Sequence, residues 1–196
     1  FLSLLTMAIT SALGACVGLV SGFFRNRIDD VLMRICDVMM SFPSEVMILA
    51  IVGMTGPGLE NVVIANVVAK WPWYARMVRS IVRQYSDKDY IRFAKVAGGS
   101  SIRIMMRHLL PGTAGELFVL TTLDTGSVIL MISALSFLGL GVQPPTPEWG
   151  MMLNEAKEVM TLYPLQMIPA GMAILLVVAA FNFLGDSLRD AFDPKH

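Results

Sequence analysis

Charged residues are scarce in this 196-residue chain, because lysine, arginine, aspartate and glutamate together supply only 15% of it. A soluble domain usually carries about 25% charged residues, and the mean hydropathy here is +0.65. The deficit argues against an ordinary soluble domain and indicates that lipid surrounds much of the surface. The formal net charge is zero, so no basic face indicates a nucleic-acid partner.

Residues and motifs typical of catalytic, metal-binding or nucleotide-binding sites are also scarce. The two cysteines, Cys16 and Cys36, lie in apolar helical patterns without CxxC spacing, so we expect both to be buried packing side chains. Only two histidines occur, His108 and His196, and neither HExxH nor GxSxG is present. We therefore expect no catalytic residues and no metal site within the chain. The GxxxxGKS/T phosphate loop is also missing, so we expect the chain itself to bind neither ATP nor another cofactor.

Long apolar runs are what the sequence has in abundance. A transmembrane helix needs about 20 mainly apolar residues. The predicted spans are 1–24, 31–54, 59–82, 112–138 and 165–185. We therefore expect an all-α, polytopic transmembrane helical bundle that forms a single domain over residues 1–196. Because the sequence starts at Phe1 inside an apolar run, we also expect one earlier span, which would make six in the full chain.

The distribution of basic residues predicts how the spans are oriented. Connections that face the cytoplasm carry an excess of lysine and arginine, and ten such residues fall within 25–30 and 76–110. The connections on the opposite side carry a single lysine, Lys157. We therefore expect 25–30, 76–110 and 186–196 to face the cytoplasm, and 139–164 to face outward.

The segment 88–111 is too charged to span a membrane and too regular for a loop. Its apolar residues recur at helical spacing and define one face: Ile91, Ala94, Gly98, Ile102, Met105 and Leu109. Since Gly98 and Gly99 interrupt the pattern, we expect two short helices that meet at an angle. Such a pair can lie on the bilayer surface, pack under its own bundle, or dock in a groove of a partner protein. Spacing alone leaves these three alternatives open.

Ionisable side chains at membrane depth are costly and often mark a pathway. Asp124 lies near the middle of the fourth predicted span, and Glu45 lies two residues after Pro43, which we expect to kink the second span. Pro43, Glu45 and Asp124 are therefore the candidate residues of a translocation path for a hydrated cation or its chelate. The alternative is a structural carboxylate at Asp124 that neighbouring hydroxyl groups or Lys70 satisfy.

The outer connection, 139–164, is rich in glycine and proline and then becomes amphipathic. Its stretch 151–160 predicts a short helix at the outer surface. Two interpretations remain open for this helix: docking or gating at the outer mouth, and a simple cap at the membrane interface.

Several blocks resemble the permeases of bacterial ABC importers, in the branch that takes up peptides and nickel. The stretch 90–111 is similar to the EAA loop of these permeases, with Ala94, Gly98 and Pro111 at matching positions. Three positions depart from that pattern: Arg92, Phe93 and His108. The other matching blocks are Ser41-Phe42-Pro43, WPWYARMVRS at 71–80, SFLGLGVQPPTPEWGMML at 136–153 and FNFLGDSLRDAFDP at 181–194.

The resemblance implies a non-catalytic permease subunit in the bacterial inner membrane. Such a subunit pairs with a second, related permease as a heterodimer, with two cytoplasmic ABC ATPase subunits that bind ATP and Mg, and with an extracytoplasmic substrate-binding protein. The ATPase-coupling residues that it implies are Arg92, Ala94, Gly98, Gly99, Ile102, Arg103, Met106, Arg107 and Pro111. The amino-acid sequence at 71–80 and at Leu123-Asp124 is more similar to nickel permeases than to dipeptide permeases. The implied substrate is nickel or a metal chelate, with dipeptides or oligopeptides as the alternative.

Two other classes of protein compete with this interpretation. A secondary transporter or channel would predict paired half-helices and repeat symmetry, and the sequence shows neither. A membrane-embedded enzyme would need a nucleophile, a base or a metal constellation, which the motifs do not provide.

Overall fold

The computed structural model describes residues 1–192, and every regular element in that range is helical. The elements in chain order are α1 (Leu2–Phe24), α2 (Arg27–Met40), α3 (Ser44–Thr55), α4 (Leu59–Ser86), α5 (Asp89–Val96), α6 (Ser101–Ile104), the π-turn η1 (Met105–Leu109), α7 (Leu110–Phe137), α8 (Trp149–Glu158), the 3-10 turn η2 (Pro164–Gln166) and α9 (Met167–Phe192). The prediction of an all-α bundle is confirmed. His196 lies outside the described residues.

The number of helices that can cross a membrane differs from the prediction. By length and apolar composition three qualify: α1, the continuous helix Ser101–Phe137, and Pro164–Phe192. The bent pair α2–α3 makes a fourth if it counts as one span. The remaining predicted span became α4, which is 28 residues long but is not among the qualifying helices. Three or four spans, where the sequence predicted five, are therefore supported by these criteria.

Helix α4 is more charged than the qualifying helices, and several of its charged side chains form ion pairs with side chains of other helices. Four of its basic side chains form ion pairs with aspartates of α2 and α7: Lys70, Arg76, Arg79 and Arg83. A charge at membrane depth is tolerated when it faces the interior of the bundle and meets a partner there. The composition of α4 is thus explained by its place among the other helices.

The second predicted span is broken rather than kinked. α2 ends at Met40, α3 begins at Ser44, and the two axes are bent by 79°. Pro43 is the residue immediately before α3, where no helical hydrogen bond requires its missing N–H group. The proline therefore starts a new helix, and residues 41–43 form a joint between α2 and α3.

Glycines allow α1 and α4 to pack at short separation. Gly14, Gly18 and Gly22 recur every four residues on the face of α1 that meets α4. A Cβ atom added at Gly18 would lie 2.6 Å from the carbonyl oxygen of Ala75 and 2.7 Å from Cβ of Val78. Small residues at this spacing are a common means of bringing transmembrane helices together. This contact fixes the position of α4 and of the site residues that it carries.

A buried carboxylate holds the broken helix to the bundle. Asp29, near the start of α2, is only 2% exposed. Its oxygens accept hydrogen bonds from Arg79 and Arg83 of α4 and from the hydroxyl group of Ser21 of α1. One carboxylate therefore joins three helices at the end of the bundle where α1 turns into α2.

An exposed ion pair forms a second link at the same end. The guanidinium of Arg25, at the end of α1, contacts Asp87, which follows α4, at 2.9 Å. The hydrogen bonds from Arg25 hold the pKa of the Asp87 carboxyl below its usual range. The chain therefore enters the segment 88–111 from a fixed point.

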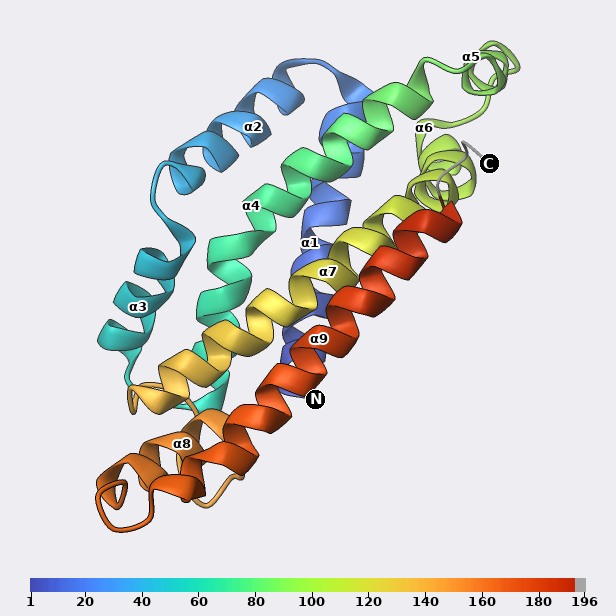
Figure 1. Ribbon diagram of the computed structural model, residues 1–196. Coiled ribbons are helices and arrows are strands. Elements are labelled where there is room, and N and C mark those ends of the chain that lie inside the picture. The colour runs from blue at the N-terminus through green and yellow to red at the C-terminus, as the bar shows by residue number, and fades with distance from the viewer. Residues whose placement is uncertain (193–196) are drawn as a thin grey trace.

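The connections fall into two groups at opposite ends of the bundle (Figure 1). The turn between α1 and α2, helix α5 and the C-terminal end of α9 lie at one end, whereas the α3–α4 turn and α8 lie at the other. These are the two groups that the count of basic residues assigned to opposite sides of the membrane. Which side each end faces stays a prediction from charge.

The two cysteines differ in environment, so the expectation that both are buried is wrong for one of them. Cys36 is fully buried beside Met33 and Ala75, whereas Cys16 is exposed. Helix α1 buries its glycine and threonine face, and Cys16 lies outside that face.

Candidate functional site

A cavity of about 450 Å³ lies where the α2–α3 joint meets α4 and α7. The residues that line it are Met40, Phe42, Pro43, Ser44, Glu45, Ala69, Lys70, Trp73, Tyr74, Asp124 and Ser127. The three residues predicted for a translocation path, Pro43, Glu45 and Asp124, thus share one cavity although Asp124 is distant from the others in sequence. That they contact a solute stays a prediction.

One wall of this cavity holds an ion pair between α4 and α7. The Lys70 ammonium donates to both carboxylate oxygens of Asp124, at 2.9 and 3.1 Å. The hydroxyl group of Tyr74, one turn after Lys70, donates to the same carboxylate at 3.1 Å. The side chains of Lys70 and Asp124 are 17% and 21% exposed, while Tyr74 is fully buried. These hydrogen bonds offset the cost of holding a carboxylate among helices, and the remaining exposure leaves the pair within reach of the cavity.

The sequence left two kinds of partner open for Asp124, and the structure shows Lys70. The hydroxyl groups of Thr121 and Thr125 donate instead to backbone carbonyl oxygens one turn earlier, those of Leu117 and Thr121. Threonine in a helix often makes this bond to its own backbone. The carboxylate therefore joins α4 to α7, and this structural contact coexists with its position in the cavity wall.

Glu45 reaches the cavity from the first turn of α3, where a negative charge is favoured by the helix dipole. Its exposed carboxylate accepts a hydrogen bond from the Ser44 hydroxyl at 3.0 Å. In the described part of the chain Glu45 forms no ion pair. Two carboxylates and one ammonium therefore face the cavity, with a formal charge of −1. Within residues 1–192 no three His, Cys, Asp or Glu side chains gather as a metal-binding group.

Sequence reasoning missed three of the larger side chains of this site. Tyr74 could have been found, because its spacing of four from Lys70 places both on one helix face. Trp73, at a spacing of three from Lys70, could have been found in the same way, whereas Phe42 could not, because its position depends on the 79° bend between α2 and α3. A bend angle of this kind is set by packing between helices that are distant in sequence.

The segment 88–111, here called the coupling segment, contains the expected pair of helices. α5 ends at Val96, Gly98 adopts a positive φ of 79° in the turn, and α6 begins at Ser101. Glycine adopts this conformation at little cost, so the prediction of a glycine corner is confirmed. α6 is not an independent helix, however, because it continues through the π-turn η1 into α7. The helix of the fourth predicted span therefore begins at Ser101 and not at residue 112.

The predicted apolar face of the coupling segment is correct at its ends and wrong in its middle. Ile91 and Leu109 are fully buried, but Ile102 is 71% exposed and Ile104, at 2% exposed, takes the inward position. The turn at 97–100 interrupts the helix, so a spacing counted through that turn does not hold.

The outward face of the coupling segment combines basic and apolar side chains. Of the nine predicted coupling residues, Ala94 and Gly99 are half-buried, and the exposed ones are Arg92, Gly98, Ile102, Arg103, Met106, Arg107 and Pro111. Sequence reasoning missed Phe93 and Val96, which are 74% and 87% exposed. Exposed apolar side chains grouped beside arginines are typical of a surface that a partner covers. Contact of these residues with an ATPase stays a prediction.

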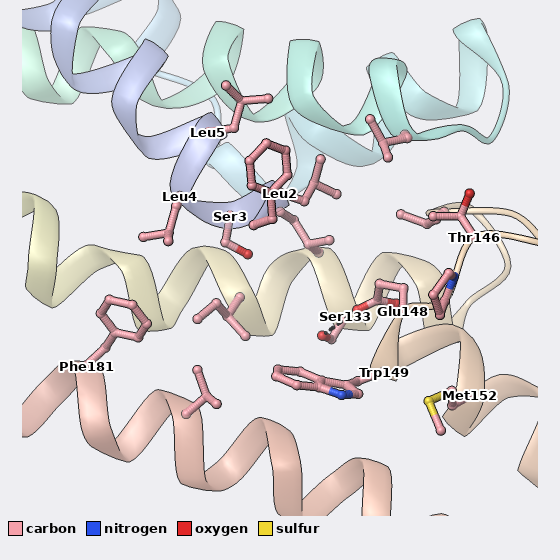
Figure 2. Close-up of a pocket in the computed structure, with 17 residues that line it drawn as sticks. Leu2, Ser3, Leu4, Leu5, Ser133, Thr146, Glu148, Trp149, Met152 and Phe181 are labelled. Atoms are coloured by element: carbon pink, nitrogen blue, oxygen red, sulfur yellow. Dashed lines mark hydrogen bonds between the residues drawn. The ribbon is translucent and has the colours of Figure 1, made fainter.

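A second cavity, of about 490 Å³, lies between the start of α1 and helices α7, α8 and α9. Figure 2 shows that its walls are mainly apolar, with Leu2, Leu4, Trp149 and Phe181 among them. This cavity lies beside α8, in the part of the chain predicted to face outward.

Helix α8 corresponds to the short helix expected at 151–160, although it begins earlier, at Trp149. Glu148 caps it by accepting a hydrogen bond from the N–H of Met151 at 3.0 Å, and Ser133 of α7 donates to the same carboxylate at 3.0 Å. The carboxylate thus ties α8 to α7. Docking, gating and capping all stay open as roles for this helix.

Comparison with known proteins places the chain in a family. The model of the family described as binding-protein-dependent transport system inner membrane component matches residues 14–196. The metal-staphylopine import system permease protein of Staphylococcus aureus is 45% identical over 168 residues, which are 86% of this chain and 58% of that protein. The nickel transport system permease protein of Escherichia coli is 40% identical over 188 residues, 96% of this chain and 68% of that protein. The glutathione transport system permease protein of Escherichia coli is 44% identical over 187 residues, 95% of this chain and 62% of that protein.

The chain thus spans 58% to 68% of the length of these relatives. Its three or four apolar helices agree with a component that crosses the inner membrane several times. The family match covers nearly all of the chain, and the relatives are at least 40% identical over most of it. The chain therefore belongs to the family of binding-protein-dependent transport system inner membrane components, the permeases of ABC importers.

Proposed function

We propose that this chain is a non-catalytic permease subunit of an ATP-driven importer and lines a translocation path for nickel or a metal chelate. The observation that carries the proposal is the continuous helix from Ser101 to Phe137. One end of this helix is the exposed α6, and Asp124 of the cavity lies roughly 35 Å further along it. A displacement applied to α6 therefore reaches the cavity wall through a single helix.

The π-turn η1 lies between α6, where an ATPase would displace the helix, and the part of α7 that lines the cavity. It occupies Met105–Leu109 and replaces the regular α-helical hydrogen bonds of that turn. π-Turns inside helices are frequent at functional sites, because their looser hydrogen bonding permits local rearrangement. We place the adjustment between the coupling segment and the spanning part of α7 at this turn.

The coupling segment offers a separate protein a surface to bind. Ile91, Ile104 and Leu109 anchor the coupling segment to the bundle, so this part of its apolar surface is buried within the chain. Phe93 and Val96 of α5 remain outside, beside exposed arginines. A groove in an ATPase subunit would receive these apolar side chains, and the arginines would form the polar rim of the contact.

We infer that the complete transporter contains a second, related permease, two cytoplasmic ABC ATPase subunits and an extracytoplasmic substrate-binding protein. ATP and Mg bind at the ATPase subunits in this arrangement. The dependence on a binding protein is supported by the description of the family. Lipid would cover the exposed apolar flanks of α1 and α9.

Metal import is proposed because two of the relatives are named for metal-staphylopine and nickel. The cavity near Asp124 supports a charged solute, since two carboxylates and one ammonium face a space of about 450 Å³. The relative named for glutathione supports peptide import as the alternative. A secondary transporter or a channel is less well supported, since the sequence shows neither the paired half-helices nor the repeat symmetry that a secondary transporter would predict.

The coupling role is tested by weakening the outward face without disturbing the bundle. We would replace Ile102 and Met106, which are 71% and 58% exposed, by serine in the assembled transporter. The matched control is Val31→Ser in α2, where the side chain is 60% exposed. We expect ATP hydrolysis stimulated by the loaded binding protein to fall at least about tenfold in the double variant, as about 1.4 kcal/mol of lost contact would produce. Stimulation equal to that of the control would contradict the coupling role.

The substrate is tested separately by uptake. Cells that contain or lack the transporter would be supplied with radioactive nickel, alone and chelated, and with a labelled dipeptide. Transporter-dependent entry of nickel supports the metal proposal, and entry of the dipeptide alone would replace it with the alternative.

A further inference from the structure

The second cavity, between the start of α1 and helices α7, α8 and α9, has a different character from the cavity near Asp124. The two cavities share no lining residue, and the second has a volume of about 490 Å³. Of its 17 lining residues all but four are apolar, the four being Ser3, Ser133, Thr146 and Glu148. Within residues 1–192 no lysine, arginine or histidine side chain lines this space.

The single ionisable side chain of this lining, in the described part of the chain, already has its partners. One carboxylate oxygen of Glu148 accepts a hydrogen bond from the Ser133 hydroxyl at 3.0 Å, and the other accepts one from the N–H of Met151 at 3.0 Å. A charged or strongly polar occupant would therefore give up its water without gaining hydrogen-bonding partners. A hydrocarbon carries no such cost, so the lining favours an apolar occupant.

The cavity is continuous with surface that faces the lipid. Leu4 and Leu5 of α1 line it and are at the same time 52% and 40% exposed. On α9, Val177 lines the cavity directly after Leu175 and Leu176, which are 58% and 60% exposed. Both helices are long and apolar enough to cross a membrane. The hydrocarbon chains that surround their exposed side chains therefore lie next to the cavity.

The cavity is polar at one end and apolar at the other. Figure 2 shows Thr146 and Glu148 at the end where α8 begins, and Leu4 and Phe181 at the opposite end. Trp149, the first residue of α8, is of a type enriched at the boundary between membrane and water. A phospholipid has the same distribution of polarity, because its headgroup lies at that boundary and its acyl chains point inward.

We propose that this cavity binds one acyl chain of a phospholipid from the surrounding bilayer, with the headgroup left outside beside the start of α8. A volume of about 490 Å³ is within the range of known ligand sites. Since the chain passes from one apolar medium to another, the gain comes from dispersion contacts with walls that otherwise lack them. The inference depends on the location of the protein in the membrane, and not on its substrate or on its coupling to an ATPase.

The test locates the acyl chain by photolabelling. The assembled transporter is placed in nanodiscs that contain phosphatidylethanolamine with a diazirine in the middle of one acyl chain, and labelled residues are identified by tandem mass spectrometry. Ile129 and Ile132 of α7 are the reporters, because they line the cavity but are only 8% and 2% exposed, out of reach of lipid on the outer surface. Leu175, at 58% exposed, is the surface reference. We expect label at both reporters as well as at the reference.

Filling the cavity should exclude the chain. Ser3→Phe combined with Val177→Phe adds two rings to the lining. We expect labelling of the two reporters, relative to the surface reference, to fall at least about tenfold, which corresponds to about 1.4 kcal/mol of lost binding. The matched control is Ala8→Phe with Leu176→Phe, which adds the same rings to exposed positions of the same helices outside the lining. This control should leave the labelling unchanged.

Label at the surface reference without label at the two reporters would overturn the acyl-chain site, and so would equal labelling in the filled and wild-type proteins. Phosphatidylglycerol with the same labelled chain should label the reporters to the same extent, because no basic side chain in residues 1–192 lines the cavity. Labelling with only one of the two headgroups would overturn the proposal that the chain is what binds. The wild-type measurement needs no substitution, so it decides the question even if the filled variant fails to fold. Labelling needs neither ATP nor a solute, so its outcome is independent of the coupling and uptake experiments.

Discussion

A single methyl group at Gly18 should destabilise the protein, because α1 and α4 leave no room for it. A Cβ atom there would lie 2.6 Å from the carbonyl oxygen of Ala75, and 2.7 and 2.9 Å from Cβ and Cγ1 of Val78. Non-bonded heavy atoms of this kind normally lie about 3.5–4.0 Å apart. Gly18→Ala therefore forces the two helices apart locally by roughly 1 Å.

The expected loss follows from two opposing effects. Overpacking costs about 1–3 kcal/mol, and the upper end applies here because the backbone oxygen of Ala75 cannot rotate away. Alanine recovers about 1 kcal/mol through its higher helix propensity, which leaves a net loss of about 2 kcal/mol. For a chain of this size, about 2–4 °C of Tm corresponds to each kcal/mol. We therefore expect Gly18→Ala to lower Tm by about 4–8 °C.

The assay is thermal unfolding of the purified transporter followed by tryptophan fluorescence. Gly171→Ala in α9 is the matched control, because an added Cβ there meets nothing within 4 Å. The control should unfold at an unchanged or slightly higher temperature. If Gly18→Ala is as stable as Gly171→Ala, the close packing of α1 on α4 is refuted.

Two further changes test the polar contacts that hold the helices. Asp29→Asn removes a carboxylate charge that is 2% exposed and faces two arginines. Breaking a buried ion pair costs about 3–5 kcal/mol. Because the arginines are partly exposed, we expect the free energy of unfolding, measured with denaturant, to fall by about 3 kcal/mol. The exposed neighbour of Asp29 gives the control Asp30→Asn, and equal stability of the two variants would show that the network contributes nothing. Glu148→Ala removes the cap of α8 and should cost about 1 kcal/mol locally, seen as faster amide exchange in the first turn of that helix. Exchange no faster than in Glu155→Ala, an exposed change within α8, would exclude the capping role.

Several features of this protein follow from short stretches of sequence. The apolar runs that became α1, α7 and α9 are long enough to predict, because both length and apolarity are local properties. Gly98 marked the corner of the coupling segment because few other residues adopt a positive φ readily. Pro43 marked a disturbance of the second span, although the sequence could not distinguish a kink from a break. Asp124 and Glu45 stood out as ionisable groups within apolar surroundings.

The tertiary structure decided the features that depend on distances between segments remote in sequence. The pairing of Lys70 with Asp124 requires α4 and α7 to lie side by side, and the position of Glu45 requires the 79° bend. The aspartates of α2 and α7 explain why α4 can carry four basic side chains inside the bundle, because each of these side chains forms an ion pair with one of them. The rotation of α6, which exposes Ile102 and buries Ile104, was set by its continuity with α7. Local composition determines which stretches become helices, whereas packing between helices determines which side chains come into contact. The cavity lined by the α2–α3 joint, α4 and α7 forms only when these helices pack together.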